Sequence, residues 1–210
     1  IIQIIDPNDF LIEKRLKRVC IKLNLKLIIL ENPMFLCKKS DLNFFKPDKK
    51  KFFQTSFYKS QREKFNILID IAGGPEGGSW TYDTMNREKY PANKKPPEII
   101  SINNETKLLS ETHEYINNNY SKNFGMLGSE FFYPTDFDQS KKWFNDFLEN
   151  RFTEFGPYED AIVDNESFLN HSLLSPLLNT GLLNVNFVIS HTIEFYLSLI
   201  HISEPTRRTD

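Results

Sequence analysis

Two short apolar runs near the start of the chain enclose a stretch in which apolar residues recur at helical spacing. Residues 1–5 and 25–30 are mostly aliphatic and have the length of buried strands. The apolar positions between them share one helical face: Ile12, Leu16, Val19 and Leu23. Asp6-Pro7 predicts where this helix begins. A strand, a helix and a second strand in close succession predict a βαβ unit and therefore a parallel sheet.

The polar positions around this helix are mostly basic. We interpret them as a solvated helix face: Lys14, Arg15, Lys17 and Arg18. The basic segment 46–51 is interpreted in the same way, as a solvated connection rather than a phosphate contact. No glycine-rich turn follows the first apolar run, so the dinucleotide-binding fingerprint is absent.

The middle of the chain contains a predicted helix followed by a long irregular segment. Residues 53–70 predict the helix, with aromatic bulk on one face. Residues 72–78 contain four glycines and a proline, which exclude a regular helix or strand interior there. Because no Lys-Ser or Lys-Thr pair follows, this segment is not a P-loop. It continues to Pro97, and a loop of that length indicates either a functional loop or a linker.

The second half of the chain predicts helices. Residues 105–120 predict one, and Thr135 to Asp138 have the spacing of a capping box that starts another. That second helix carries a broad apolar stripe: Phe144, Phe147, Leu148, Phe152 and Phe155. Gly156-Pro157 ends it, and Asn184 opens a last helix. We assign Trp143, beside the stripe, to core packing rather than to an electron-transfer chain.

Residues 168–181 predict a small-polar turn that enters a short helix. Ser175 can cap this helix, Pro176 suits its first position and Gly181 suits a left-handed stop. Free backbone N–H groups and hydroxyls at a helix start can bind an anion such as a phosphate. The alternative is an ordinary capped core helix, and the residues alone favour that alternative.

The same segment resembles the flavin-diphosphate motif of the photolyase/cryptochrome superfamily, roughly Thr-Ser-x-Leu-Ser-Pro-x-Leu-x-x-Gly. The matching positions are Ser172, Leu174, Ser175, Pro176, Leu178 and Gly181. His171 stands where most families of the superfamily have Thr. The form with histidine resembles one branch, the deoxyribodipyrimidine photolyase-related proteins, which are the iron–sulfur bacterial cryptochromes and prokaryotic (6-4) photolyases.

Other segments carry the same resemblance, in the same order along the chain. Ser56 to Arg62 is similar to the family's aromatic-basic helix, and Gly77 to Asp83 is similar to its Gly-Gly-x-Trp-x-aromatic-Asp pattern. Asn86-Arg87 and the turn from Gly156 to Ala161 also fit. The ordered match extends over nearly all of residues 1–196, which makes it more specific than any single motif.

This resemblance implies an α/β fold followed by an all-α fold. Residues 1–45 would be the C-terminal part of a Rossmann-like, parallel-sheet antenna domain. Residues 46–134 would be a helix plus a long interdomain connection. Residues 135–196 would be the first helices of a helical FAD-binding domain.

The resemblance also implies a function for a longer parent protein. Blue light would excite reduced FAD, which passes an electron to a UV-induced pyrimidine photoproduct, of the 6-4 type, flipped out of DNA. The alternative is a cryptochrome-type blue-light photoreceptor with the same cofactors and no repair activity. The family further implies a 4Fe-4S cluster and a lumazine antenna, whose ligands are absent from this sequence, and a monomer that acts on UV-damaged DNA.

The resemblance assigns few cofactor-binding residues to this chain: Tyr158, His171, Ser172, Leu174 and Ser175. They would contact the flavin diphosphate, and with His171 in place of Thr the backbone N–H contacts would remain. No catalytic residue and no metal ligand is assigned within the chain. Expressed alone, the chain is expected to be inactive and to hold FAD weakly.

The overall composition bears on nucleic-acid binding, on the cellular compartment and on membrane spans. The formal net charge is −2, so the chain as a whole has no electrostatic footprint for nucleic acid. Cys20 and Cys37 lack CxxC spacing, and we interpret both as buried thiols of a reducing, cytoplasmic compartment. No uninterrupted apolar run is long enough to span a membrane.

The two ends of the chain carry expectations of their own. The chain begins at Ile1 rather than at a methionine. Residues 197–207 resemble the in-frame translation of a sequencing-library adapter, so we exclude residues 197–210 from the fold and the function. We therefore expect an internal fragment of a longer gene.

Overall fold

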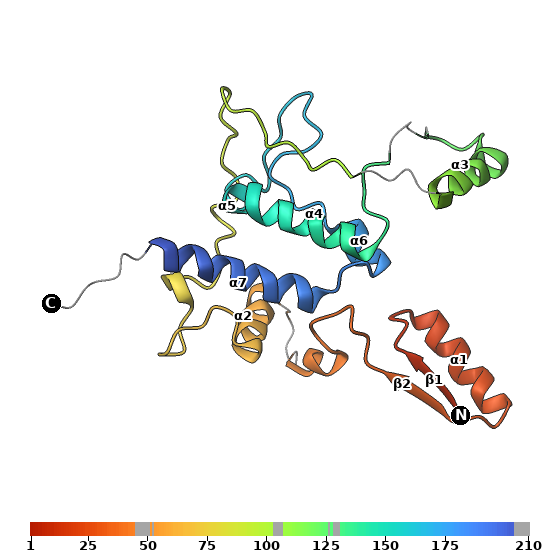
Figure 1. The fold of residues 1–210 in the computed structure, drawn as a ribbon. Helices are drawn as coiled ribbons and strands as arrows, with labels where there is room; N and C mark the ends of the chain where they lie inside the picture. Colours follow the sequence, from red (N-terminus) through yellow and green to blue (C-terminus); the bar gives the residue numbers. More distant parts are fainter. Residues whose placement is uncertain (45–50, 52, 103–106, 126, 128–130, 204–210) are drawn as a thin grey trace. The chain divides into compact units, whose positions relative to one another are not determined.

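The structure, a computed structural model, describes residues 1–44, 51, 53–102, 107–125, 127 and 131–203 (Figure 1). The chain divides into two compact units. The N-terminal unit comprises Ile1–Thr84 with Asn184–Asn186, and the helical unit comprises Met85–Leu183 with the chain from Phe187 onward. The N-terminal unit contains the sheet, and the helical unit contains most of the buried apolar side chains.

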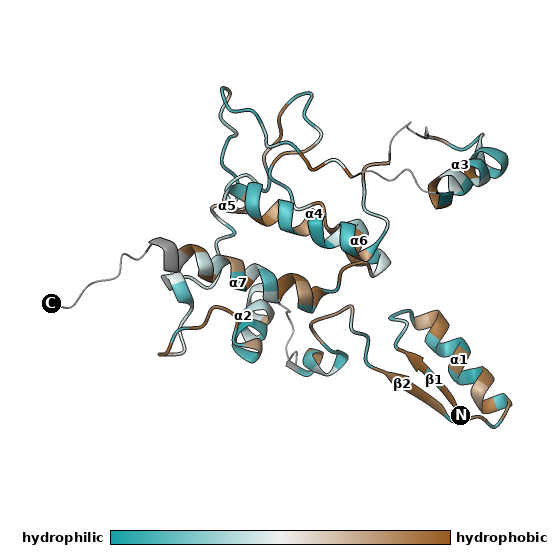
Figure 2. Ribbon diagram, in the orientation of Figure 1, coloured by the Kyte–Doolittle hydropathy of each residue, from teal (hydrophilic) through white to brown (hydrophobic). Residues whose placement is uncertain are grey.

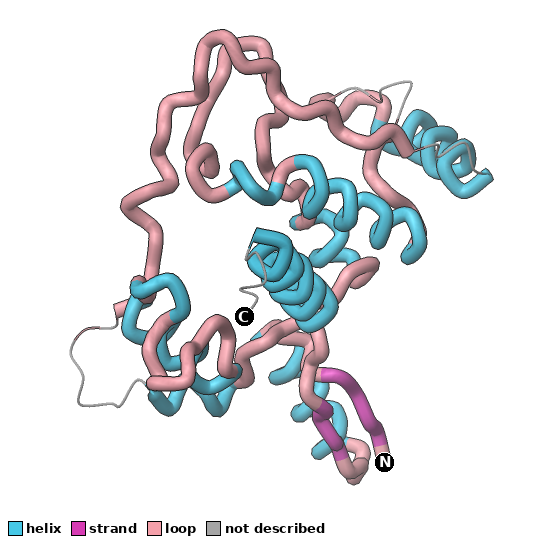
Figure 3. The backbone as a smooth tube through the Cα atoms, turned by 60° about the vertical axis from the view of Figure 1, so that its left-hand side comes forward, coloured by secondary structure: helices cyan, strands magenta, loops and turns pink. Residues whose placement is uncertain are grey.

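The N-terminal unit begins with the predicted βαβ arrangement. Strands β1 (Ile2–Ile5) and β2 (Leu27–Leu30) pair in parallel along their whole length. They lie side by side in Figure 3, and both are strongly apolar in Figure 2. Helix α1 (Phe10–Lys22) connects them. The α/β start of the chain is therefore confirmed, with a two-stranded sheet in the part of the chain that the structure describes.

Helix α1 begins later than Asp6-Pro7 predicts. Its N-cap is Asp9, whose carboxylate accepts a hydrogen bond from the Ile12 N–H at 2.8 Å. The Asp6 carboxylate accepts instead from the Asn8 N–H at 2.9 Å and so shapes the turn before the helix. The prediction was wrong because two aspartates precede the apolar stretch, and the second one caps it.

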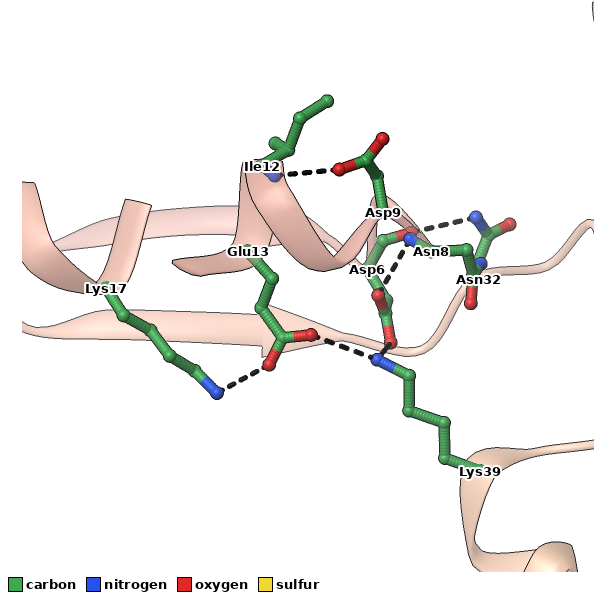
Figure 4. A network of polar contacts seen from close by, with 8 residues as sticks. All are labelled: Asp6, Asn8, Asp9, Ile12, Glu13, Lys17, Asn32 and Lys39. Atoms are coloured by element: carbon green, nitrogen blue, oxygen red, sulfur yellow. Dashed lines mark hydrogen bonds and ion pairs between the residues drawn. The ribbon is translucent and has the colours of Figure 1, made fainter. Parts of the chain in front are cut away.

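Lys39 joins the segment after β2 to the end of β1 and to α1 (Figure 4). Its Nζ lies 2.7 Å from Asp6 Oδ2 and 3.2 Å from Glu13 Oε2. The hydrogen bond from Lys39 lowers the pKa of the Asp6 carboxyl, and hydrogen bonds from Lys17 and then Lys39 lower that of Glu13. The Asn32 side chain donates to the Asp6 carbonyl at 2.8 Å. Polar side chains thus tie the carboxyl end of β1 to its neighbours.

The described part of the N-terminal unit continues with the 3₁₀ helix η1 (Lys39–Phe44), α2 (Gln54–Phe65) and the 3₁₀ helix η2 (Glu76–Gly78). Helix α2 ends before residue 70, where the sequence predicts its end. Its C-cap is Asn66, which adopts a left-handed φ of 51°. Most of the basic segment 46–51 lies outside the described residues.

Arg62 explains why α2 stops early. Its buried guanidinium donates to the carbonyl oxygens of Leu68 at 2.7 Å, Trp80 at 2.9 Å and Ile67 at 3.2 Å. A buried guanidinium is costly unless its N–H groups find acceptors. The irregular segment after α2 folds around Arg62. The carbonyl oxygens of Ile67 and Leu68 point toward this side chain, so they do not accept the backbone hydrogen bonds that would continue the helix.

The helical unit is built from α3 (Lys107–Tyr120), α4 (Phe137–Asn150), α5 (Phe152–Phe155), α6 (Ser175–Thr180) and most of α7 (Val185–Ser203). Its buried cluster contains three of the five residues of the predicted stripe, Phe144, Phe147 and Leu148, together with Trp143, Leu174, Leu177 and Leu183. The other two, Phe152 and Phe155, lie on α5 rather than on α4 and are partly buried against the cluster. Trp143 is fully buried and packs with Tyr133, with ring centroids 5.5 Å apart. The assignment of Trp143 to the core agrees with this burial.

The ends of α4 differ from the prediction by a few residues. The N-cap is Asp136, not Thr135, and it accepts from the Gln139 N–H at 2.8 Å. Gln139 Oε1 accepts from the N–H of Thr135, the residue before the cap, at 3.1 Å, so the pair that closes the helix start is Asp136 and Gln139, one residue later than predicted. The helix ends at Asn150 rather than at Gly156, because Arg151 leaves the helical region with φ −130° before α5 begins.

Helix α7 begins one residue after Asn184 and runs through residue 197 to Ser203 without a break. The expected adapter boundary therefore leaves no mark on the described backbone, and the origin of residues 197–210 stays a prediction. Among the described residues, no helix combines the length and apolar character needed to cross a membrane. Cys20 is buried as predicted, whereas Cys37 is only half-buried, and burial raises the pKa of the Cys37 thiol.

Candidate functional site

The Asn86-Arg87 pair lies against the turn that contains Tyr158, in the helical unit. The Glu88 N–H donates to the Pro157 carbonyl at 3.0 Å, and the Asp160 N–H donates to the Asn86 carbonyl at 3.2 Å. Arg87 Nε lies 3.3 Å from Asp160 Oδ2. Two segments that carry the family resemblance, more than sixty residues apart, therefore meet in space.

His171 connects the flavin-like motif to the same turn. Its Nε2 lies 3.0 Å from the Glu159 carbonyl oxygen. The imidazole can donate to that oxygen, which leaves Nδ1 as the ring nitrogen open to another partner. The structure thus brings together Tyr158 and His171, two of the residues that the sequence proposed for a cofactor.

A lysine lies beside Tyr158. The rings of Tyr158 and Tyr90 are 4.8 Å apart between centroids, and Lys94 Nζ lies 5.5 Å from the Tyr158 centroid and 6.0 Å from the Tyr90 centroid. Lys94 also forms an ion pair with Glu154, and this hydrogen bond raises the pKa of Lys94. Burial raises the pKa of Tyr90. A charged ammonium is therefore held against the face of the proposed phosphate-binding tyrosine.

Glu154 extends this contact toward the motif. Its second carboxylate oxygen lies 3.5 Å from Asn170 Nδ2, at the limit of a hydrogen bond. Asn170 is 1% exposed, and its Oδ1 has no hydrogen-bond partner among the described residues. Because Asn170 directly precedes His171, the Lys94–Glu154 pair helps to position the start of the motif.

The motif residues themselves divide into two groups. Ser172 is half-buried and Ser175 is exposed, and neither hydroxyl has a hydrogen-bond partner in the part of the chain that the structure describes. Leu174 is buried in the core at 6% exposure, so only its backbone can contact a ligand. The serine hydroxyls are the motif groups with donors to offer.

Ser175 is not the N-cap of α6. The cap position is Leu174, which has no capping side chain, and Ser175 is the first helical residue. Pro176 follows it and lacks an N–H, so the start of this six-residue helix offers fewer backbone donors than the sequence suggested. Gly181 ends the helix with φ 78°, as predicted.

A cavity of about 390 Å³ lies beside His171, and three carboxylates line it: Glu159, Asp160 and Glu166. Like charges repel strongly at short range, so this cavity disfavours a diphosphate. No group of three or more metal-ligating side chains occurs among the described residues.

The sequence did not identify Tyr90, Lys94, Glu154 or Asn170 as site residues. Lys94 belongs to a Lys-Lys-Pro-Pro segment, which predicts a loop. Glu154 lies in a predicted helix, where a glutamate is ordinarily exposed to solvent. Their roles come from contacts between distant segments. The one local signal was the position of Asn170, an amide residue immediately before the motif histidine.

Comparison with known proteins adds an independent finding. A family model described as "Deoxyribodipyrimidine photo-lyase-related protein" matches residues 1–132. A (6-4) photolyase of Agrobacterium fabrum is 25% identical over 181 residues, which are 85% of this chain and 35% of that protein. An uncharacterized protein of Acanthamoeba polyphaga mimivirus is 42% identical over 94 residues, 43% of this chain and 47% of that protein. The chain thus spans less than half the length of either relative.

Proposed function

The chain belongs to the deoxyribodipyrimidine photo-lyase-related family, and on that premise we propose that it is part of a flavoprotein that uses light to reverse UV-induced pyrimidine photoproducts of the 6-4 type. The observation that carries the proposal is the family match over residues 1–132, together with the similarity to a (6-4) photolyase. The parent protein would be a DNA photolyase, a carbon–carbon lyase.

We assign the two units to the two halves expected of such a protein. The N-terminal unit is the remainder of a Rossmann-like antenna domain, which its parallel βαβ arrangement supports. The helical unit is the start of the FAD-binding domain, which the aromatic core on α4 supports. A lumazine antenna has no assigned residue in this chain.

The helical unit contains a donor set that fits a flavin diphosphate. Diphosphate recognition requires hydrogen-bond donors and a nearby cation. Ser172 and Ser175 supply hydroxyls and Tyr158 supplies a phenol. Lys94, 5.5 Å from the Tyr158 ring, supplies the cation when it exchanges its partner Glu154 for a phosphate. Bound FAD would supply the electron that light drives to the damaged base. The residues of this chain bind and orient the phosphates of that cofactor.

His171 has a positioning role in this proposal. Through Glu159 it fixes the distance between the turn at Tyr158 and the serines of the motif. That hydrogen bond occupies Nε2, so His171 acts by holding the turn in place, and not through the hydroxyl that a threonine has at this position in most related families. Nδ1 is left to face the phosphates.

The 4Fe-4S cluster does not fit the residues of this chain. Such a cluster requires four cysteine thiolates, and the chain has two cysteines, Cys20 and Cys37. Both are free thiols. No step of the proposed reaction is therefore assigned to a cluster ligand here, and the proposed partner of the parent protein is UV-damaged DNA.

A repair assay tests the function. The parent protein, reduced under anaerobic conditions, is mixed with an oligonucleotide that carries one (6-4) photoproduct, and the bases are analysed by chromatography with and without blue light. We expect restored pyrimidines only in the light. A flavin-loaded protein that restores none would favour the photoreceptor alternative, and a protein that contains no flavin would overturn the proposal.

A further inference from the structure

The hydroxyl of Tyr90 is buried without a hydrogen-bond partner, and the proposed diphosphate site does not use it. Tyr90 is 6% exposed, and its hydroxyl neither donates to nor accepts from any of the described residues. A buried hydroxyl that makes no hydrogen bond costs free energy, and such groups are rare in native proteins. The group is explained if it has a partner in a second state of the site.

The carboxylate of Glu154 lies close to this hydroxyl. In the turn that follows Tyr90, the Lys94 N–H donates to the Pro91 carbonyl at 3.0 Å, and Lys94 Nζ lies 6.0 Å from the Tyr90 ring centroid. Glu154 forms the ion pair with that lysine. Burial raises the pKa of Tyr90 most, Lys94 lowers it, and the negative charge of Glu154 raises it again. The phenol and the carboxylate are therefore near enough to interact.

The two oxygens of Glu154 are held in different ways. Oε1 pairs with Lys94 Nζ, and Oε2 lies 3.5 Å from Nδ2 of Asn170, which is 1% exposed. The side chains of Lys94 and Glu154 are 32% and 39% exposed. An ion pair that solvent reaches to this extent changes an equilibrium by about fivefold or less. A stronger anion can therefore take Lys94 from Glu154, while the buried Asn170 keeps the carboxylate near Tyr90.

We propose that Glu154 is an exchange residue, which pairs with Lys94 while the diphosphate site is empty and accepts a hydrogen bond from the Tyr90 hydroxyl once a phosphate has taken Lys94. The inference rests on the proposed flavin site and adds a second state to it. In the empty state the ammonium of Lys94 neutralises Glu154. In the filled state the ammonium neutralises the phosphate, and Tyr90 and Asn170 hold the released carboxylate.

The exchange solves an electrostatic problem of the site. A carboxylate released beside a phosphate repels it, because like charges interact strongly at short range. A hydrogen bond from the Tyr90 hydroxyl reduces that repulsion, and hydrogen bonds to an ionised acceptor are about twice as strong as those between neutral groups. The ligand that drives the exchange is therefore a diphosphate, whatever else the molecule carries, so ADP should respond as FAD does.

The alternative is a permanent ion pair, in which Glu154 only ties the segment of Lys94 to α5. In that case Glu154→Gln frees Lys94 to move and weakens binding of a diphosphate. The exchange predicts the opposite sign, because a glutamine does not compete with phosphate for the ammonium. A permanent pair also leaves the Tyr90 hydroxyl without a partner in both states, whereas the exchange gives it one, which is why the structure favours the exchange.

Titration of the flavin-free parent protein with FAD and with ADP tests the exchange. We expect Glu154→Gln to bind both about fivefold more tightly than the unsubstituted protein. Glu98→Gln is the matched control, because it removes the same charge from an exposed pair with Lys95, and it should bind both as the unsubstituted protein does. Circular dichroism would verify that each variant remains folded.

Tyr90→Phe provides a second, independent readout. It should weaken binding of FAD about tenfold, because the released carboxylate loses a donor. Without ligand the variant should melt at the same or a higher temperature, because it removes a buried hydroxyl that has no partner. In a Glu154→Gln background the loss of affinity should shrink to about threefold or less, because the charged acceptor is gone. Tyr115→Phe, at a position 58% exposed, is the control and should change neither quantity.

The outcomes separate this inference from the proposed function. A parent protein that binds neither FAD nor ADP would overturn both. A parent protein that binds FAD, with a Glu154→Gln variant that binds it no more tightly than Glu98→Gln does, would overturn the exchange alone. So would a Tyr90→Phe variant that melts at a lower temperature and binds FAD as tightly as the unsubstituted protein.

Discussion

The two units of the chain bury their apolar side chains to very different extents. Among the described residues of the N-terminal unit, Cys20 is the one apolar side chain classed as buried, while Ile1 and Ile21 are each 81% exposed. The helical unit buries a seven-residue cluster around Trp143 and Phe144. A two-stranded sheet is marginally stable unless it packs well against other elements, and the exposed apolar residues of this unit show little such packing. The N-terminal unit thus depends on polar contacts, and the helical unit depends on its core.

This contrast predicts that the two units respond to different perturbations. Removing core volume should damage the helical unit and leave the N-terminal unit intact. Removing the buried guanidinium of Arg62 or protonating the carboxylates that Lys39 contacts should do the reverse. The chain contains one tryptophan in each unit, Trp80 and Trp143, so the two can be followed separately.

The largest effect is expected from Phe144→Ala. Phe144 is fully buried and lies 5.8 Å from Phe187 between ring centroids. Truncating such a phenylalanine leaves a cavity and destabilises by about 3–5 kcal/mol. Urea unfolding followed by Trp143 fluorescence, in a Trp80→Phe background, should show this loss. Phe137→Ala, on the same helix but 62% exposed, is the control and should change stability by less than about 0.5 kcal/mol.

The second effect is expected in the N-terminal unit, from Arg62→Gln. The substitution removes the charged donor that satisfies the carbonyls of Ile67, Leu68 and Trp80. Loss of a buried, charge-assisted hydrogen-bond group costs about 2–3 kcal/mol. Limited proteolysis should then cut the segment after α2, while Glu63→Gln, an exposed neighbour on that helix, should not change the cleavage pattern. Unchanged resistance in the Arg62 variant would contradict the assigned role.

A smaller effect is expected from the N-cap of α4. Asp136→Ala removes the acceptor of the Gln139 N–H and should cost about 1 kcal/mol. Asp138→Ala, in the first turn of the same helix, removes a similar charge but no cap, and should cost about half as much or less. Equal losses in thermal unfolding would mean that Asp136 acts only through its charge.

The smallest effect is a pH dependence centred on Lys39. Because the pKa values of Asp6 and Glu13 are lowered in the folded chain, their stabilising contribution is present above their unfolded values of 3.8 and 4.5. It is lost as the pH falls through the lower folded values. The pKa of Lys39 is raised, so its contribution is lost at high pH, above 10.5. The melting temperature of Lys39→Gln should fall less steeply with decreasing pH than that of the unsubstituted chain. Lys38→Gln is the control, because Lys38 pairs with Glu31 instead, and its melting temperature should depend on pH as in the unsubstituted chain.

Local patterns in the sequence were sufficient to predict the βαβ start and the apolar stripe of α4. Apolar periodicity depends on neighbouring residues, and burial follows it on α4, whereas Ile12, Val19 and Leu23 on the predicted apolar face of α1 remain 45–58% exposed. Helix ends were less predictable, because several residues compete to cap one helix. Asp9 caps α1 in place of Asp6, and Asp136 caps α4 in place of Thr135.

The candidate site was predictable only in part. Resemblance of motifs pointed to Tyr158 and His171, and the structure connects them through Glu159. Nothing local pointed to Lys94, because its proximity to Tyr158 depends on how an extended segment crosses the turn. Likewise, the early end of α2 depends on carbonyls that Arg62 contacts beyond the helix.

The most direct test of the central claim is the flavin content of the purified parent protein and of three variants. We predict stoichiometric FAD in the parent and in Lys95→Gln, whose lysine pairs with Glu98 at the surface. The variants Ser172→Ala/Ser175→Ala and Lys94→Gln should bind FAD about tenfold or more weakly, the effect of losing one charge-assisted contact. Equal flavin content in all four proteins would contradict the proposed diphosphate site, and no flavin in the parent would contradict the proposed function.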